Sequence, residues 1–78
     1  MSKKVTIYST PTCHFCHLAK DFFQEKGVKY EEYNVATDLE KRKEMVEKSG
    51  QMGVPVIDID GQIVVGFAEE QVASLLGL

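Results

Sequence analysis

Cys13 and Cys16, separated by two residues, are the pair of side chains in this sequence whose chemistry is easiest to interpret. At this spacing on the first turn of a helix, two sulfurs reach bonding distance without unwinding the chain. The 78 residues contain no other cysteine, so they cannot form a framework of structural disulfides. An isolated pair of this kind is typical of catalytic or redox-sensing thiols in a reducing compartment. We therefore predict a reversible dithiol–disulfide pair in a cytoplasmic protein.

The sequence around the cysteines predicts a strand, a short turn and then a helix. Residues 4–9 form an apolar run with high strand propensity. In the turn at residues 10–12, proline interrupts the strand and threonine can cap the helix that follows. An amphipathic segment at residues 14–26 is the predicted helix. Cys13 is thus expected at the N-terminal end of a helix.

This position favours the thiolate form of Cys13, because the first backbone N–H groups of a helix have no partner within the helix. A helix terminus stabilises a charge by about 0.3–1 kcal/mol, or roughly 2 kcal/mol when it is partly buried. One pKa unit corresponds to about 1.4 kcal/mol, so we expect the pKa of Cys13 to fall by about one unit, toward neutral pH. Cys13 is then the attacking thiolate, and Cys16, one turn into the helix, resolves the mixed disulfide.

Two histidines and one lysine near the pair could affect its chemistry. A protonated His14 beside the thiolate would shift the balance between thiol and disulfide, whereas an exposed neutral His14 would have little effect, and the sequence leaves both open. His17 and Lys20 are candidate acceptors for the proton of Cys16.

The first predicted helix and the segment after it have distinct patterns. Gly27 is the residue expected just past the helix end, and residues 28–35 have the propensity of a second strand. One face of the helix is expected in the core through its apolar residues: Leu18, Ala19, Phe22 and Phe23.

A second helix is predicted from residue 37 to about Lys48. Thr37 and Glu40 have the spacing of a capping box, and Ser49-Gly50 closes the helix. The helix is highly charged, so few of its residues are expected to reach the core: Leu39, Met45 and Val46.

The C-terminal third predicts a hairpin and a last helix. Residues 56–59 and 62–65 flank Asp60-Gly61, which suits a type I′ turn, and residues 68–76 form an amphipathic helix. The order β-α-β-α-β-β-α indicates an α/β fold in which the first two strands are parallel. We expect one domain over residues 1–78, with a four-stranded mixed sheet flanked by three helices.

Charge and hydropathy exclude several classes of function. The net charge is −3, with lysines and glutamates interleaved, which argues against a nucleic-acid surface. The apolar run behind the N-terminal lysines is too short for a signal peptide or a membrane span. We expect a monomer that binds neither nucleic acid nor membrane.

Taken together, the motifs resemble those of the glutaredoxins, in the thioredoxin superfamily, over essentially the whole chain. The resemblance rests on four anchors in order: Cys13 to Cys16 after a strand, Gly50-Gln51, Val54-Pro55, and Gly66 before the last helix. It implies a thioredoxin-like fold with strand order 2-1-3-4, thiol–disulfide oxidoreductase activity, no bound cofactor or metal, and glutathione as co-substrate. The base rate for X-Pro bonds favours a trans Pro55, whereas the resemblance implies a cis bond.

The resemblance also implies where glutathione or another substrate would bind. The implied contacts are Phe15, Gln51, Val54, Pro55, Gly66, Phe67, Ala68 and Glu69. The family usually has a lysine at the position of Thr10, Arg-Thr at Met52-Gly53, and a hydroxyl or thiol residue at Ala68. Two missing cationic contacts of about 1 kcal/mol or more each would weaken glutathione binding by one or two orders of magnitude.

A second electron source is open because Gly66-Phe67 also resembles a pair found in small glutaredoxin-like redoxins. Those proteins are reduced by thioredoxin reductase and donate electrons to ribonucleotide reductase. In either case disulfide-bearing proteins are expected substrates, and Phe15 and Phe67 could form an apolar rim for them.

Three other interpretations of the cysteines remain at this point. Cys13 to His17 fits the C-x-x-C-H pattern of c-type haem, with Met45 or Met52 as a second axial ligand. Cys13, Cys16 and His17 could share a zinc ion or a cluster, although a closed site requires four ligands. The two cysteines could also simply pack at a helix start.

Overall fold

A mixed four-stranded sheet is the centre of the protein. The structure is a computed structural model that describes residues 3–78. Its strands lie in the order β2-β1-β3-β4, with β1 parallel to β2 and antiparallel to β3, and β3 antiparallel to β4. This confirms the predicted α/β fold and strand order. Along the chain the elements are β1 (Val5–Ser9), α1 (His14–Glu25), β2 (Glu31–Asn34), α2 (Leu39–Ser49), β3 (Val56–Ile59), β4 (Gln62–Val65) and α3 (Glu69–Leu76).

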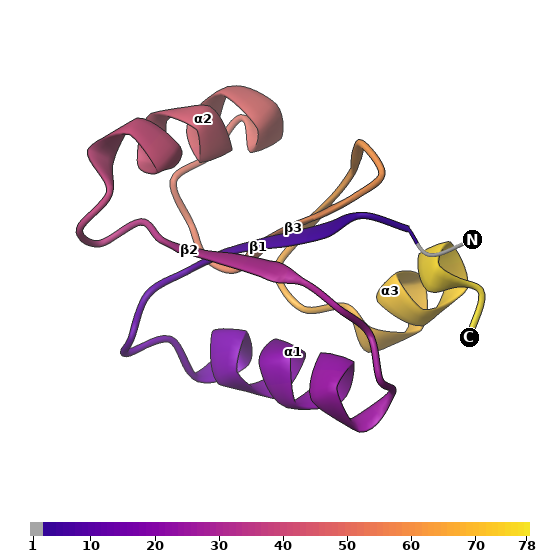
Figure 1. The fold of residues 1–78 in the computed structure, drawn as a ribbon. Helices are drawn as coiled ribbons and strands as arrows, with labels where there is room; N and C mark the ends of the chain where they lie inside the picture. The colour runs from indigo at the N-terminus through magenta and orange to yellow at the C-terminus, as the bar shows by residue number, and fades with distance from the viewer. Residues whose placement is uncertain (1–2) are drawn as a thin grey trace.

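The helices cover the two faces of the sheet unequally. Figure 1 shows α1 and α3 on one face and α2 on the other. Every residue of β1 is buried, because this central strand is covered on both faces. Val5 and Ile7 face α1 and α3, whereas Tyr8 packs on the other face with Met45 of α2.

The larger core cluster lies between the sheet, α1 and α3. Helix α1 contributes Ala19, Phe22 and Phe23, but Leu18 is 40% exposed and is not part of the buried face predicted for it. Cys16, and not Leu18, is among the buried residues of this helix. The buried members of this cluster are Val5, Ile7, Ala19, Phe22, Phe23, Ile57, Ile59, Val64 and Val72.

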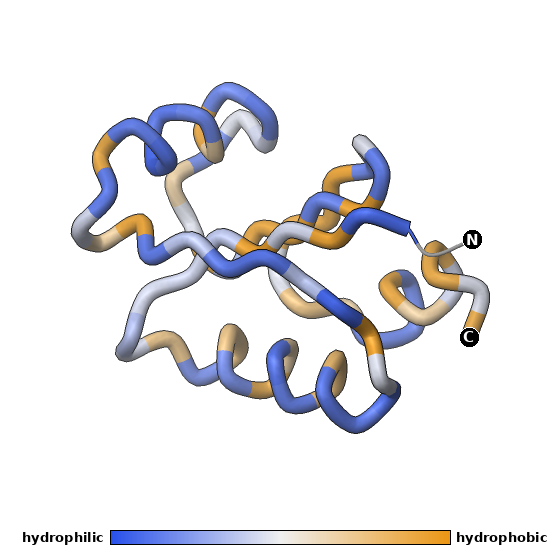
Figure 2. The backbone as a smooth tube through the Cα atoms, viewed as in Figure 1, coloured by the Kyte–Doolittle hydropathy of each residue, from blue (hydrophilic) through white to orange (hydrophobic). Residues whose placement is uncertain are grey.

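Helix α2 is attached by far less apolar surface. Figure 2 shows it as mainly hydrophilic, and within the described part of the chain Met45 is the one residue of α2 that is fully buried. Val46 packs against the smaller cluster, as predicted, but Leu39 is 71% exposed, so its assignment to the core was wrong. Leu39 is the first residue of the helix, where a side chain can project past the edge of the sheet.

The cap of α2 also differs from the prediction. Asp38, not Thr37, is the N-cap, and its carboxylate accepts a hydrogen bond from Lys41 N at 3.1 Å. The Thr37 hydroxyl donates to Asn34 O at 3.4 Å instead. The capping box predicted for residues 37–40 was therefore wrong by one residue, although the helix itself was correctly placed.

The second strand is shorter than predicted because the end of α1 extends into the expected strand. Gly27 has a positive φ of 68°, and Val28 N donates to Phe23 O at 2.8 Å, as in a Schellman motif. The chain is therefore still closing the helix at residue 28, and β2 begins at Glu31.

The hairpin between β3 and β4 agrees with the prediction. Asp60 and Gly61 have positive φ values of 51° and 89°, as a type I′ turn requires. The carboxylate of Asp58 accepts a hydrogen bond from Gly61 N at 2.7 Å, which holds the turn closed. The last helix begins at Glu69, with Ala68 as its N-cap.

We predict that Met45→Ala lowers the free energy of unfolding by about 2–4 kcal/mol, because it leaves a cavity under α2. Leu39→Ala, an exposed apolar truncation in the same helix, is the matched control and should cost less than about 0.5 kcal/mol. Urea unfolding followed by circular dichroism measures both. Equal losses in the two variants would contradict this account of how α2 is held.

Candidate active site

Strand register brings three distant segments to one edge of the sheet. Tyr8 near the end of β1 pairs with Val56 at the start of β3, and Val56 pairs with Val65 at the end of β4. The segments 10–13, 50–55 and 66–68 therefore leave or enter the sheet at the same edge, which is formed by the end of β1, the start of β3 and the end of β4. These segments are the turn that leads into the cysteine pair, the proline loop and the start of α3. The sequence had linked them only by resemblance.

The cysteines lie at the start of α1 and are joined as a disulfide, with Cα atoms 5.2 Å apart. Cys13 is the N-cap, and its sulfur accepts a hydrogen bond from Cys16 N at 3.1 Å. The predicted threonine cap is therefore replaced by the cysteine itself. Cys16 has no exposed surface, whereas Cys13 is only partly buried. In the reduced protein the same N–H and the helix dipole would favour negative charge on the Cys13 sulfur.

The two histidines occupy exposed positions beside the pair. His17 Nε2 lies 2.9 Å from Pro11 O, and the His14 ring meets the Phe15 ring edge-on, with centroids 5.7 Å apart. Across residues 3–78, no group of three His, Cys, Asp or Glu side chains is arranged to hold a metal ion. The His17 side chain thus contacts the backbone oxygen of Pro11, in the turn before the cysteines.

A polar cluster lies under α1 on the sheet face that this helix covers. Lys20 Nζ lies 2.7 Å from Glu32 Oε2, and the buried Ser9 hydroxyl donates to the same oxygen at 2.8 Å. The hydrogen bond from Lys20 is the main reason that the pKa of Glu32 is lowered, and the bond from Ser9 contributes. No motif marked Ser9 or Glu32. Glu32 lies on the α1 face because it pairs with the inward-facing Ile7, and the sequence alone does not give this register.

The proline loop has the geometry that the resemblance implied. The peptide bond between Val54 and Pro55 is cis. Pro55 is buried, Val54 is half-buried and Gln51 is exposed. Pro55 O accepts a hydrogen bond from Gly66 N at 2.8 Å, so the loop and the segment before α3 are in direct contact.

The remaining predicted contact residues differ in how accessible they are. Phe15 is 58% exposed next to the cysteines, whereas Phe67 is half-buried and packs on Phe22, with ring centroids 5.7 Å apart. Phe67 is therefore in part a core residue. Ala68 and Glu69 are exposed at the start of α3, where Ala68 forms no side-chain cap.

None of the helices within residues 3–78 is long and apolar enough to cross a membrane.

Comparison with known proteins places this geometry in context. The sequence profile of the Glutaredoxin family matches residues 5–64. An uncharacterized glutaredoxin-like 8.6 kDa protein in the rubredoxin operon of Clostridium pasteurianum is 44% identical over 72 residues, covering 92% of this chain and 96% of the relative. Glutaredoxin 3 of Escherichia coli K12 is 42% identical over 62 residues, covering 80% of this chain and 75% of the relative.

A solved structure shows the same arrangement of elements. The crystal structure of the thioredoxin-like protein BC3987 superposes with a TM-score of 0.87 at 32% identity, covering 92% of this chain and 99% of the other. The strand–turn–helix context of the cysteines is thus shared with proteins of this fold, which favours a redox pair over haem attachment or simple packing.

The lowered pKa of Glu32 predicts a pH-dependent contribution to stability. Folding favours the carboxylate, so the contribution is present above the ordinary pKa of 4.5 and is lost as the pH falls through the lower pKa of the folded state. We expect Glu32→Gln to be less stable than the wild type at pH 7 and nearly equal to it below that pKa. Urea unfolding from pH 3 to 7 measures the difference, with the exposed Glu47→Gln as control. A difference that does not change with pH would contradict the assignment.

Proposed function

Because this chain belongs to the glutaredoxin family, whose members are thiol–disulfide oxidoreductases, we propose that it reduces protein disulfides and glutathione mixed disulfides through Cys13 and Cys16. The observation that carries the proposal is the asymmetry of the pair: Cys13 is partly exposed and hydrogen-bonded to the N-terminal end of α1, and Cys16 is fully buried.

The proposed cycle has two exchange steps. The Cys13 thiolate attacks one sulfur of a substrate disulfide, forms a mixed disulfide and releases the other sulfur as a thiolate that takes up a proton. Cys16 then loses its proton and attacks the Cys13 sulfur, which releases the second substrate thiol and leaves the Cys13–Cys16 disulfide. Two external thiols reduce this disulfide and are themselves oxidised to a disulfide, which restores the starting state.

Glutathione is the proposed co-substrate, and no bound cofactor is needed for this cycle. We propose that Phe15 and Gln51 contact the substrate from two sides of the cysteines, and that backbone groups near Val54 provide further hydrogen bonds. The other proposed contacts are Pro55, which follows Val54 in the same loop, and four residues in the segment that leads into α3: Gly66, Phe67, Ala68 and Glu69.

The site lacks cations where the family usually holds glutathione. Thr10 carries no charge, and Met52 is 60% exposed as an apolar side chain. This observation supports a second candidate, a redoxin that is reduced by thioredoxin reductase and passes electrons to a protein such as ribonucleotide reductase. The exposed Phe15 and Met52 suit a protein surface better than a charged tripeptide.

We place this activity in the cytoplasm and in a monomer of one domain, because a readily reduced pair of thiols operates in a reducing compartment.

Turnover of a glutathione mixed disulfide with glutathione and its reductase, run beside an assay with thioredoxin reductase, tests both candidates. We expect activity in the glutathione arm, with a high KM. Thr10→Lys should lower that KM by about 3- to 10-fold, because it adds one partly exposed ionic contact to the substrate.

Gln62→Lys adds the same charge on the exposed hairpin, away from the cysteines, and should leave KM unchanged. Activity only with thioredoxin reductase would favour the second candidate. No reduction of any disulfide in either arm would overturn the proposed function.

A further inference from the structure

A chain of polar contacts joins α2 to the sheet. Lys48 Nζ lies 2.9 Å from Asp58 Oδ2 on β3 and donates to the Tyr8 hydroxyl oxygen on β1 at 3.1 Å. The Tyr8 hydroxyl in turn donates to Glu44 Oε2 at 2.5 Å. Glu44 and Lys48 are one turn apart on α2, so one face of this helix contacts both β1 and β3. We refer to Tyr8, Glu44, Lys48 and Asp58 as the α2 clamp.

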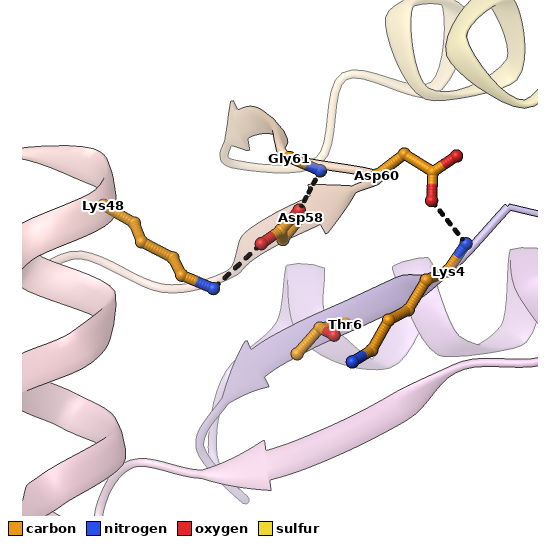
Figure 3. Close-up of a pocket in the computed structure, with 6 residues that line it drawn as sticks. All are labelled: Lys4, Thr6, Lys48, Asp58, Asp60 and Gly61. Atoms are coloured by element: carbon orange, nitrogen blue, oxygen red, sulfur yellow. Dashed lines mark hydrogen bonds and ion pairs between the residues drawn. The ribbon is translucent and has the colours of Figure 1, made fainter.

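The sheet holds the partners of Lys48 rigidly. Tyr8 is fully buried, with its ring in the cluster that contains Met45 and Val56. Asp58 Oδ1 accepts a bond from Gly61 N, as Figure 3 shows, so the hairpin turn fixes the orientation of this carboxylate. Lys48 therefore meets two acceptors that are already in place.

Lys48 and Tyr8 keep one protonation state at neutral pH. The hydrogen bonds to Asp58 and Tyr8 hold the pKa of Lys48 well above its ordinary value of 10.5. Burial, followed by the bond to Glu44, raises the pKa of Tyr8. The ammonium group is thus charged and the phenol protonated wherever the protein would act.

Solvent reaches one side of the clamp. Lys48 and Asp58 line a depression of about 450 Å³ on this face of the sheet (Figure 3). A solvent-exposed ion pair alone contributes little to stability. The bond from Lys48 to the buried Tyr8 hydroxyl therefore distinguishes this contact from an ordinary surface pair.

The clamp lies immediately before the proline loop, residues 50–55. Gly50 ends α2 with a positive φ of 76°. Ser49 Oγ lies 2.8 Å from Met45 O and accepts a bond from Gln51 N at 3.3 Å. The position of Gln51 is consequently tied to the last turn of α2.

Tyr8 fixes both ends of this loop. Its hydroxyl binds Lys48 just before the loop begins, and its backbone pairs with Val56 just after the loop ends. Met45 is the one fully buried residue of α2 in the described chain, with Val46 packed beside it, so apolar contacts restrain this helix at few points. The polar clamp adds a restraint at the last turn of α2, directly before the loop starts.

We propose that Lys48 is a positioning residue that holds the proline loop in place for substrate by joining α2 to Tyr8 and Asp58. This inference rests on the proposed function, since Gln51 and Val54 are its proposed substrate contacts. Lys48 does not touch the reacting sulfurs, so its loss should weaken substrate binding and leave the exchange steps at the cysteines intact.

Steady-state kinetics of Lys48→Met tests this, at a temperature where circular dichroism shows the variant folded. Methionine keeps the length of the side chain and removes the charge and the donors. We expect KM for a disulfide substrate to rise about 3- to 10-fold, as for the loss of one charge-assisted hydrogen bond, with kcat within about twofold. The matched control is Lys43→Met in the same helix, because Lys43 is exposed and has no side-chain bond or ion pair within residues 3–78.

Tyr8→Phe removes the hydroxyl alone and completes a double-mutant cycle. The KM effects of Tyr8→Phe and Lys48→Met should be less than additive, because both variants break the same contact. A lower thermal midpoint for Lys48→Met with an unchanged KM would show a merely structural role and overturn the proposal.

Amide hydrogen exchange tests the clamp without relying on turnover. Amides of residues 50–54 should exchange about tenfold faster in Lys48→Met than in the wild type, and not in Lys43→Met. Unchanged exchange would overturn the clamp even if the enzyme is active, whereas a wild type without any disulfide reductase activity would overturn the proposed function instead.

Discussion

The antiparallel pairing of β1 with β3 determines which parts of the chain meet at the cysteines. Because Tyr8 lies opposite Val56, the turn that leads to Cys13 and the loop that ends at Pro55 reach the same edge of the sheet. The pairing of Val56 with Val65 then adds Gly66 and the start of α3 to that edge. Without this register, neither the proline loop nor the start of α3 would lie beside the cysteines.

The asymmetry of the cysteines follows from their places on α1. Cys13 precedes the helix, so its sulfur can accept a backbone N–H and still meet solvent, whereas Cys16 turns toward the core one turn later. The two sulfurs are bonded yet differ in access, which suits one thiol for attack and the other for resolution. The two helices next to the site also differ in packing. The cysteines lie at the start of the densely packed α1, whereas the proline loop follows the polar α2.

Apolar periodicity, Gly27, Gly50 and the Asp60-Gly61 turn predicted the order of the elements along the chain and the positions of all three helices. The strand order 2-1-3-4 was implied instead by the resemblance to the glutaredoxins. The sequence did not predict the N-caps of α1 and α2. Asp38, Thr37 and Cys13 can all accept a backbone hydrogen bond, and the local backbone decides which one does so. Leu18 and Leu39 were wrongly expected in the core. A helical pattern gives the direction of a side chain but not how much of the sheet lies beneath it.

The long-range polar contacts were also outside the reach of the sequence. The contact between Lys48 and Tyr8 spans 40 positions, and the contact between Ser9 and Glu32 spans 23. None of these residues belongs to a recognisable motif. They meet because β1 is the central strand, and a register between strands is required to see which side chains share a face.

The most direct test of the account is to trap the mixed disulfide on single-cysteine variants. Reduced Cys16→Ser and Cys13→Ser proteins are each mixed with glutathione disulfide and analysed by intact-mass spectrometry. The account predicts one glutathione on Cys13 in the Cys16→Ser protein and little or none on the buried Cys16 in the Cys13→Ser protein. Rapid modification of Cys16 with none at Cys13 would contradict the assignment of Cys13 as the attacking thiol.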